Sequence, residues 1–276
     1  VPLSGQTAST LALGVVTLTD AGAYSVVITN PGGNATSIDA VLAVNAVPPA
    51  FQSEPASVTV NDGGAAAFSV AASGTGPLAY QWLRNAVALP GATSATLTLP
   101  VVGLADIADY AVVVSNSAGS ITSAPAHLTV TPNPPSIVTQ PASLTINDGE
   151  AASFSVLAAG TGPLSYQWHK DGAPITDATN SAFAIAIAGL SDGGSYSVII
   201  TNSVGSVTSA NAVLTVNPIP PTFTLQPVSQ SVFDGDSVSF STAATGSAPI
   251  TFQWRKDGVP LSGQTASTLA LGVVTL

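Results

Sequence analysis

Two histidines, His127 and His169, are the only imidazole side chains in this chain of 276 residues. An imidazole can act as a general base or bind zinc, but both tasks need further polar groups that converge on it. The two residues lie in unlike contexts, one beside Leu128 and one directly after Trp168, and neither recurs along the chain. We interpret both as surface residues and expect no catalytic residue, no cofactor, no metal site and no enzyme activity.

Aspartates in glycine-containing turns form a second candidate group, for which the chemistry would be calcium binding. They are Asp62, Asp148, Asp234 and Asp236. Calcium takes about six to eight oxygen ligands, whereas an Asp-Gly pair is typical of a turn. Turn formation is the favoured interpretation, and calcium at the joints between repeats is the alternative.

Sugar chemistry is the third candidate. Asn34-Ala35-Thr36 is the one N-glycosylation sequon, so Asn34 is a candidate acceptor. Tryptophans can serve as stacking platforms for sugars, and the chain has three, at Trp82, Trp168 and Trp254. Each follows a glutamine near the end of an alternating apolar stretch, which favours a place in a buried core.

Charge and hydropathy exclude two classes of partner. Four basic residues stand against fourteen acidic ones with no basic run, so a phosphate backbone could not be neutralised and nucleic acid is not an expected partner. Hydrophobic residues reach 46%, but they occur in short runs, and none approaches the roughly 18 residues of a membrane-spanning helix. We expect no membrane span in these residues.

The surface is expected to be weakly charged, because only 7% of the residues carry a charge. Such a surface favours lateral packing in a fibre or sheath, or sugars on the many hydroxyl groups. The alternative explanation is that the low charged fraction only reflects the amino-acid composition typical of the lineage. The chain has no cysteine, which excludes disulfides and thiolate sites. An extracellular bacterial protein that avoids thiols and trypsin-like cleavage fits this composition.

The chain consists of internal repeats. Its three Gln-Trp pairs are spaced by 86 residues, and the segment Val1–Leu18 is identical to Val259–Leu276, 258 residues later. The same eighteen residues agree with Val87–Leu104 at only ten positions. Neighbouring repeats have therefore diverged while repeats 258 residues apart have not, which indicates a three-domain super-repeat in a longer array.

Proline-rich joints divide the repeats, and we expect them to act as stiff spacers in a linear, rod-like array. The predicted divisions are a C-terminal half domain over residues 1–46, complete domains over 47–132 and 133–218, and an N-terminal part of a domain over 219–276. Neither part at the two ends can close a core alone, so the split domain is expected to be completed by the neighbouring repeat or by another chain.

Short alternating stretches predict an all-β fold of about seven strands per repeat, and no stretch shows a helical period. Within one repeat the predicted strands are Ala65–Ser73, Leu78–Trp82, Ala95–Leu99, Tyr110–Val114 and Ser120–Val130, with Tyr166–Trp168 and Phe252–Trp254 repeating the tryptophan strand. Asp171-Gly172 and Asp257-Gly258 are suited to tight hairpins. These features predict a β-sandwich.

These residues resemble the immunoglobulin superfamily, most closely its intermediate-set domains and the tandem domains of bacterial surface and secreted proteins. Phe68–Gly74 is similar to the family's B strand and Trp82 to its C-strand tryptophan. The resemblance implies that three Asp-Tyr pairs form tyrosine corners. With the tryptophans they make the predicted structural core: Trp82, Trp168, Trp254, Tyr24, Tyr110, Tyr196, Asp20, Asp106 and Asp192.

The departure from the family lies at its disulfide. The B-strand cysteine position holds Val70, Val156 or Thr242, and the F-strand position holds Val26, Val112 or Val198. Losing such a bridge costs a few kcal/mol, so each sandwich must depend on its packing and on its neighbours. Thr242 is the position that the sequence does not explain.

A structural role is the leading hypothesis: a unit of a long extracellular fibre, filament or cell-surface stalk that assembles with itself head to tail and side by side. The alternative is an adhesin or carbohydrate-binding stalk that presents a terminal module to glycans or to a host surface. An accessory rod of a secreted enzyme is a third hypothesis. The fold itself serves recognition, spacing and adhesion alike.

Overall fold

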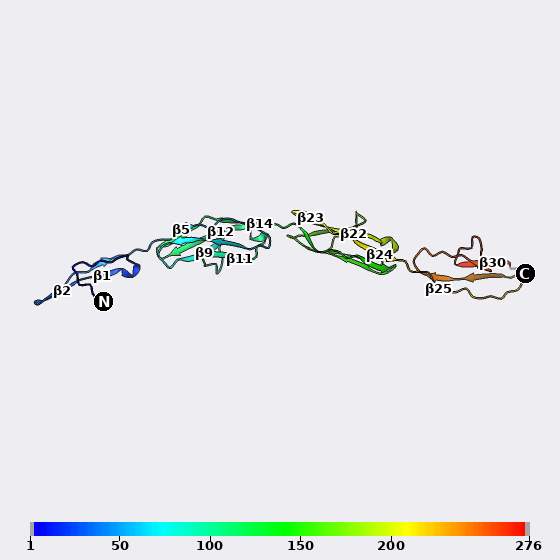
Figure 1. The fold of residues 1–276 in the computed structure, drawn as a ribbon, viewed down its shortest axis with the longest axis horizontal. Coiled ribbons are helices and arrows are strands. Elements are labelled where there is room, and N and C mark those ends of the chain that lie inside the picture. Colours follow the sequence, from blue (N-terminus) through cyan, green and yellow to red (C-terminus); the bar gives the residue numbers. More distant parts are fainter. Residues whose placement is uncertain (1–2, 274–276) are drawn as a thin grey trace. The chain divides into compact units, whose positions relative to one another are not determined.

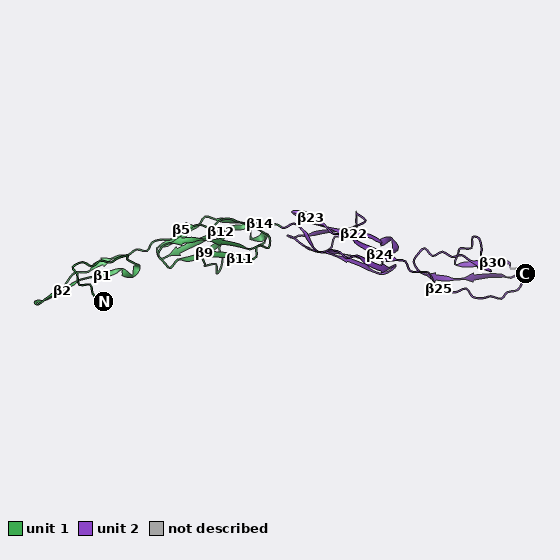
Figure 2. Ribbon diagram, viewed as in Figure 1, with its two compact units in different colours: residues 1–132 green, residues 133–276 purple. Residues whose placement is uncertain are grey.

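The computed structural model describes residues 3–273, and within that range it contains strands and three short 3-10 turns but no α-helix. The chain divides into two compact units, Val1–Pro132 and Asn133–Leu276 (Figure 2). Each unit holds one complete two-layered sandwich and one smaller set of strands. No helix in the described part is long and apolar enough to cross a membrane.

The first sandwich is built from ten strand segments. They are β5 (Ala50–Ser53), β6 (Val58–Asn61), β7 (Ala66–Ser69), β8 (Ala71–Ser73), β9 (Ala79–Arg84), β10 (Val87–Ala88), β11 (Thr96–Leu99), β12 (Ala108–Asn116), β13 (Gly119–Thr122) and β14 (Ala126–Thr131). The larger sheet has the order β10-β9-β12-β14-β6, with β13 also paired to β12. The second layer consists of the pairs β11-β7 and β5-β8. Figure 1 labels β5, β9, β11, β12 and β14 of this sandwich.

The second sandwich repeats this plan in the other unit. Its strands are β15 (Ser136–Thr139), β16 (Leu144–Asn147), β17 (Ala152–Ser155), β18 (Leu157–Ala159), β19 (Ser165–Lys170), β20 (Ala173–Pro174), β21 (Ala182–Ile185), β22 (Gly194–Asn202), β23 (Gly205–Thr208) and β24 (Ala212–Asn217). The sheet order is β16-β24-β22-β19-β20, with β23 paired to β22. The all-β fold expected from the sequence is confirmed.

Alternation along the strands explains where the core lies. Every second residue of β12 is buried, from Ala108 through Tyr110 and Val112 to Val114, and the residues between them face outward. A strand turns successive side chains to opposite faces, so this pattern places one apolar row against the second layer. Phe68 of that layer stacks on Tyr110 at a centroid distance of 4.9 Å and lies 6.2 Å from the ring of Trp82.

Two predicted strands are each divided in the structure. The stretch Ala65–Ser73 breaks at Val70, whose N–H donates to the carbonyl of Ala95, so β7 pairs with β11 and β8 pairs with β5. The apolar alternation continues through the break and gives no sign of it. The predicted strand Ser120–Val130 is likewise divided into β13 and β14, which pair with different parts of β12.

The remaining strands form smaller sets at the two ends. In the first unit they are β1 (Gly22–Tyr24), β2 (Val27–Asn30), β3 (Gly33–Thr36) and β4 (Ala40–Leu42). In the second unit they are β25 (Thr222–Leu225), β26 (Ser237–Ser241), β27 (Ala243–Thr245), β28 (Arg255–Lys256), β29 (Val259–Pro260) and β30 (Thr268–Val273).

The prediction of a strand over Phe252–Trp254 is wrong. These three residues are irregular, and only Arg255–Lys256 pair, with β29. In the complete sandwiches the tryptophan strand is held by β12 or β22, and residues 219–273 contain no counterpart of either. Without that partner the backbone of residues 252–254 has no ladder to join.

Candidate functional site

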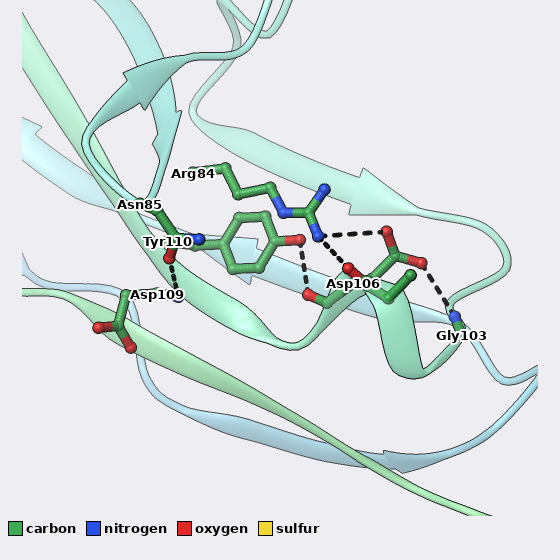
Figure 3. Close-up of polar contacts among 7 residues, drawn as sticks. Arg84, Asn85, Gly103, Asp106, Asp109 and Tyr110 are labelled. Atoms are coloured by element: carbon green, nitrogen blue, oxygen red, sulfur yellow. Dashed lines mark hydrogen bonds and ion pairs between the residues drawn. The ribbon is translucent and has the colours of Figure 1, made fainter.

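The tyrosine corner is the polar site whose residues the sequence predicted most specifically. The phenol of Tyr110 donates a 3.1 Å hydrogen bond to the backbone carbonyl of Asp106, which ends the 3-10 turn Leu104–Asp106 (Figure 3). The carboxylate of Asp106 accepts a 2.9 Å hydrogen bond from the N–H of Gly103. The corner therefore closes the turn at both ends and ties it to the fully buried ring of Tyr110.

Arg84 extends this corner. Its guanidinium Nη2 lies 3.8 Å from Asp106 Oδ1 and also donates to the carbonyl of Ala105 (Figure 3). About one third of each charged side chain is exposed, so the pair contributes little through charge alone. Arg84 Nε is buried and has no hydrogen-bond partner among residues 3–273.

The corner recurs in the other repeats. Tyr196 donates to the carbonyl of Asp192 at 2.7 Å, and Tyr24 donates to that of Asp20 at 2.6 Å. Burial raises the pKa of both Tyr110 and Tyr196 above the ordinary value of 10.0, because the phenolate is poorly solvated there. Hydrogen bonds from Thr17, chiefly from its N–H, lower the pKa of the Asp20 carboxyl.

The three predicted tryptophans differ in exposure. Trp82 and Trp168 are fully buried, so neither ring offers a face to a sugar. Trp254 is only half-buried. All three indole N–H groups donate 2.9 Å hydrogen bonds to a backbone carbonyl twelve residues later. Tyr24 is also half-buried, whereas Tyr110 and Tyr196 are enclosed.

The glutamine of each Gln-Trp pair has a defined task. The Gln81 amide donates to the carbonyls of Trp82, at 2.9 Å, and Leu89, at 2.7 Å. Gln167 does the same with Trp168 and Ile175. This side chain bridges the tryptophan strand to the segment after its hairpin, which explains why Gln recurs with Trp.

A second recurrent site lies where each complete domain begins. The Asn116 amide donates to the carbonyls of Val47, at 2.7 Å, and Thr75, at 2.8 Å, while the N–H of Val47 donates to the hydroxyl of Thr75. In the second unit Asn202 holds Asn133 and Thr161 in the same way. We call this arrangement the joint clamp, because Val47 and Asn133 belong to the proline-rich joints.

Sequence reasoning missed the joint clamp. Its residues do recur at 86-residue spacing, as Asn30, Asn116 and Asn202, so a column-by-column comparison of the repeats would have found them. The same spacing relates Ser123 and Ser209, two buried serines whose hydroxyls accept from the N–H groups of Val112 and Val198.

The histidines and acidic turn residues make local contacts. His127 Nδ1 lies 2.7 Å from Asp109 Oδ1 on the exposed face of β12 and β14, and His169 Nδ1 lies 3.2 Å from the carbonyl of Gln167. The N–H groups of Asp62 and Asp148 donate to the carbonyls at the ends of β14 and β24. Across residues 3–273 no three His, Cys, Asp or Glu side chains converge as metal ligands would.

Asn34 lies on β3 in the hairpin with β2, where it is exposed and opposite Thr29. Exposure is what a glycan acceptor requires, so Asn34 stays a candidate on geometry. The polar contacts that recur within residues 3–273 thus hold the backbone: they fix turns, strands and joints.

The model of the immunoglobulin I-set domain matches this chain twice, over residues 49–130 and 135–216. The chain belongs to the immunoglobulin I-set family. Each match covers one complete sandwich, so the tandem arrangement of I-set domains is shown.

Relatives of this I-set chain come from muscle, from a phage and from a family of leucine-rich repeat proteins. It is 26% identical over 279 residues to the muscle M-line assembly protein unc-89 of Caenorhabditis elegans, covering 92% of this chain and 3% of that protein. It is 43% identical over 82 residues to the decoration protein of Escherichia phage T5, covering 29% and 50%. Leucine-rich repeats and immunoglobulin-like domains protein 3 of Homo sapiens is 31% identical over 216 residues, covering 72% and 19%.

Among solved structures, the titin domains Z1Z2 in complex with telethonin are 29% identical, with a TM-score of 0.43, and cover 63% of this chain and 98% of that one. The titin I-band fragment I67–I69 is 24% identical with a TM-score of 0.36, covering 82% and 89%. The I-set chain spans half or less of the length of the curated relatives named above.

The I-set disulfide positions are filled by apolar side chains in the complete domains. Val70 and Val112 are buried in one, and Val156 and Val198 in the other. Thr242, which the sequence left unexplained, is buried and donates a 2.7 Å hydrogen bond to the carbonyl of Leu225. Its hydroxyl is therefore satisfied inside the layer, as burial requires.

Proposed function

We propose that this I-set chain is the structural repeat unit of a long extracellular fibre, filament or cell-surface stalk of a bacterium. The repeating unit is a 258-residue super-repeat of three domains, with domains over 47–132 and 133–218 and a third assembled from residues 219–276 and the equivalent of residues 19–46 in the next repeat. The proposed partner is the protein itself, head to tail along the array and side by side between arrays.

One observation carries this proposal: the contacts that recur at 86-residue spacing hold backbone to backbone. The tyrosine corner and the joint clamp appear in both complete domains with the same atoms. Repeated domains in which the same contacts stabilise turns and joints are suited to a long array of repeats. Among its relatives, one is named a muscle M-line assembly protein and another a phage decoration protein.

Composition supports the proposed location. The chain has no cysteine, four basic residues and a charged fraction of 7%. Such a surface repels its neighbours weakly and favours lateral packing. The scarcity of Lys and Arg also leaves few sites for trypsin-like proteases outside a cell.

The mass of the native polypeptide tests the proposal. Antibodies against the 276-residue chain should detect, under full denaturation, a species far above 27.1 kDa, and partial cleavage should give a ladder spaced by one 258-residue unit. A single denatured species near 27.1 kDa would contradict the long array.

A glycan array probed with the 276-residue chain separates the structural role from the adhesin alternative. The buried Trp82 and Trp168 offer no stacking face, so we expect no saturable binding. Specific, saturable affinity for one glycan would favour the adhesin.

A further inference from the structure

The smaller layer of each complete sandwich ends in an open strand edge. Among residues 3–273, β11 pairs only with β7, and β21 pairs only with β17. The second edge of β11 and of β21 therefore has no neighbouring strand in the described part of the chain. Both strands belong to complete sandwiches, so every repeat that folds in this way presents the same edge.

The segment before β11 is bound elsewhere. Residues 89–95 form turns, and the N–H of Leu89 donates to the carbonyl of Trp82 while the N–H of Trp82 donates to the carbonyl of Ala92, both at 2.9 Å. The corresponding segment before β21 makes the same contacts with Trp168. These segments thus use their hydrogen bonds on the tryptophan strand of the larger sheet and form no strand beside β11 or β21.

The register of β11 shows which backbone groups face the open edge. The N–H of Val70 donates at 3.0 Å to the carbonyl of Ala95, which lies directly opposite in this register. Hydrogen-bonded pairs alternate along an antiparallel ladder, so Leu97 is the next residue that bonds to β7. The N–H and carbonyl groups of Thr96 and Thr98 therefore point away from β7.

Strand β21 has the same arrangement. The N–H of Val156 donates at 3.0 Å to the carbonyl of Ser181, its direct neighbour in the register. The backbone groups of Ala182 and Ala184 consequently point away from β17. Each complete domain offers a short row of outward donors and acceptors at this edge.

Proteins protect strand edges with bulges, prolines, charges or short length, and the other outer strands of these sandwiches show such features. Strands β5 and β15 have a register shift, β10 has two residues, and β20 contains Pro174. Strands β6 and β16 lead directly into Asp62 and Asp148. The sequences of β11, Thr-Leu-Thr-Leu, and β21, Ala-Phe-Ala-Ile, contain no charge, proline or register shift.

Charge favours a second copy of the chain as the neighbour at this edge. The formal net charge is −10, so two copies repel each other wherever their charged surfaces meet. In both sandwiches the strands of the smaller layer carry no charged residue, whereas the larger sheets contain Arg84, Asp109 and Lys170. Repulsion is therefore weakest between two smaller layers.

Of the two edges, β11 is the better suited to this contact. The segment before it, residues 89–95, is uncharged, whereas the corresponding segment before β21 contains Asp177. Thr96 and Thr98 are also β-branched and exposed, and such side chains are favoured as cross-strand pairs.

One register uses every outward group of β11. Two copies of the strand can pair antiparallel about a two-fold axis, with Thr96 of each copy opposite Thr98 of the other and the two Leu97 residues opposite each other. Both Thr96–Thr98 pairs then exchange their N–H and carbonyl bonds. A register that places Thr96 opposite Thr96 would leave half of these groups unused.

We propose that β11 binds β11 of a second copy of this chain, antiparallel and with Thr96 opposite Thr98, so that the smaller layers of two domains become one sheet. This inference rests on the proposed side-by-side packing of arrays and names its contact. A single four-residue edge is a weak contact, but an edge that recurs at 86-residue spacing strengthens the association of two arrays through avidity.

Hydrogen exchange of the 276-residue chain at increasing concentration tests the contact directly. The N–H of Leu97 is held by β7 at every concentration, whereas those of Thr96 and Thr98 exchange rapidly in the free chain. When about 90% of the copies are bound, exchange at Thr96 and Thr98 should slow about tenfold, because only the free fraction exchanges. Exchange at Leu97 should not change with concentration.

Single cysteines test the register, and the chain has no cysteine of its own. The Cα atoms of a hydrogen-bonded antiparallel pair lie about 5.5 Å apart, within the range of about 4.4–6.8 Å for a disulfide. Two Thr96 positions would be diagonal neighbours at about 7–8 Å. Under mild oxidation a mixture of Thr96→Cys and Thr98→Cys should give a covalent dimer of twice 27.1 kDa, and neither variant alone should do so.

Proline at the outward positions tests whether the backbone makes the contact. Thr98→Pro combined with Ala184→Pro removes two outward N–H groups and leaves the bonds to β7 and β17 in place. Sedimentation of this variant should show association weakened about tenfold or more relative to the parent chain. The matched control, Thr98→Val with Ala184→Val, keeps both N–H groups and should associate like the parent. Protection of the Leu97 amide confirms that the proline variant is folded.

Any one of three results would overturn the contact: exchange at Thr96 and Thr98 that is independent of concentration, a cysteine mixture that cross-links no more than the single variants, or a folded proline variant that associates like the parent. The mass of the native polypeptide tests the proposed array separately. A 258-residue ladder without edge pairing would overturn this contact alone, whereas edge pairing by a native species of 27.1 kDa would support the contact and contradict the long array.

Discussion

The hydroxyl of Tyr196 donates a 2.7 Å hydrogen bond to the backbone carbonyl of Asp192, while the ring of the same tyrosine stacks on Phe154 at a centroid distance of 4.7 Å. One side chain therefore joins a surface turn to the opposite layer of the sandwich. The carboxylate of Asp192 closes the turn from the other side by accepting from Gly189 at 2.8 Å. A chain without disulfides gains a fixed link between its layers in this way.

Tyr196→Phe tests the link by removing only the hydroxyl. Because the part-buried carbonyl of Asp192 loses its donor while the ring packing persists, we expect a loss of about 0.5–1.5 kcal/mol in the unfolding free energy of that domain. Hydrogen exchange of the β22 amides in the whole chain measures it locally. Amides of β12, in the other complete domain, are the internal control, and equal effects on both domains would contradict a local role.

Alkaline pH should act on the same tyrosines. Burial holds the pKa of Tyr110 and Tyr196 above 10.0 in the folded chain, so the folded state retains protons that the unfolded state releases first. Their contribution to stability is complete below pH 10 and is lost as pH rises through the folded pKa values. Tyrosinate absorbance should show a late phase that coincides with unfolding, and Tyr110→Phe with Tyr196→Phe should remove it.

Asp171 holds the turn between β19 and β20 through a side-chain hydrogen bond. Its equivalent in the first sandwich, Asn85, makes the same contact with an uncharged side chain. Asp171 Oδ1 accepts from the N–H of Ser195 at 2.8 Å, and Asn85 Oδ1 accepts from Asp109 at 3.1 Å. Both residues have positive φ, 51° and 48°, a conformation that Asp and Asn tolerate better than other residues. Asp171→Asn should therefore keep the hydrogen bond from Ser195 and lose only the charged contact with Lys170, whereas Asp171→Ala should lose both and destabilise the turn more.

The Asp171 substitution also has a pH signature. The hydrogen bond from Lys170, followed by that from Ser195, lowers the pKa of the Asp171 carboxyl below 3.8. Its contribution is present above that value and is lost as pH falls through the folded pKa. The NMR shift of the Ser195 amide should titrate below pH 3.8 in the parent chain and stay constant in Asp171→Asn; a midpoint above 3.8 would contradict the assignment.

The sequence predicted the sandwich because its main determinants are local and periodic. A tryptophan at every eighty-sixth position and a tyrosine four residues after an aspartate are visible in one dimension. The break at Val70 is not, because the residues on both sides alternate alike while their partners, β11 and β5, lie elsewhere in the chain. The strand over 252–254 failed for a related reason: alternation reports which face is apolar, and pairing requires a neighbour.

The joint clamp escaped prediction because its parts are far apart in sequence. Asn116 lies 69 residues after Val47, and its amide satisfies carbonyls on two separate segments. Asparagine in a turn has a sufficient local explanation, and Asn116 does accept from the N–H of Ala118. Only the two hydrogen bonds that the amide nitrogen of Asn116 donates, to the carbonyls of Val47 and Thr75, show that the turn also holds the joint.

Gly160 provides the last prediction, since it packs directly against the joint clamp. A Cβ at this position would lie 2.9 Å from Pro135 Cα and 3.0 Å from the carbonyl oxygen of Pro134, and φ is +143°. Gly160→Ala must therefore strain its own backbone and move the proline joint, at a cost of about 1–3 kcal/mol.

Exchange of the Thr161 amide reports this cost, because its N–H donates to the carbonyl of Asn133 at 3.1 Å. We expect that exchange to accelerate about five- to 150-fold in Gly160→Ala, following the free-energy cost. Gly162→Ala is the matched control, since a Cβ there meets nothing within 4 Å and Ala248 holds the equivalent position in the next repeat. Equal exchange in the two variants would show that the glycine does not maintain the joint.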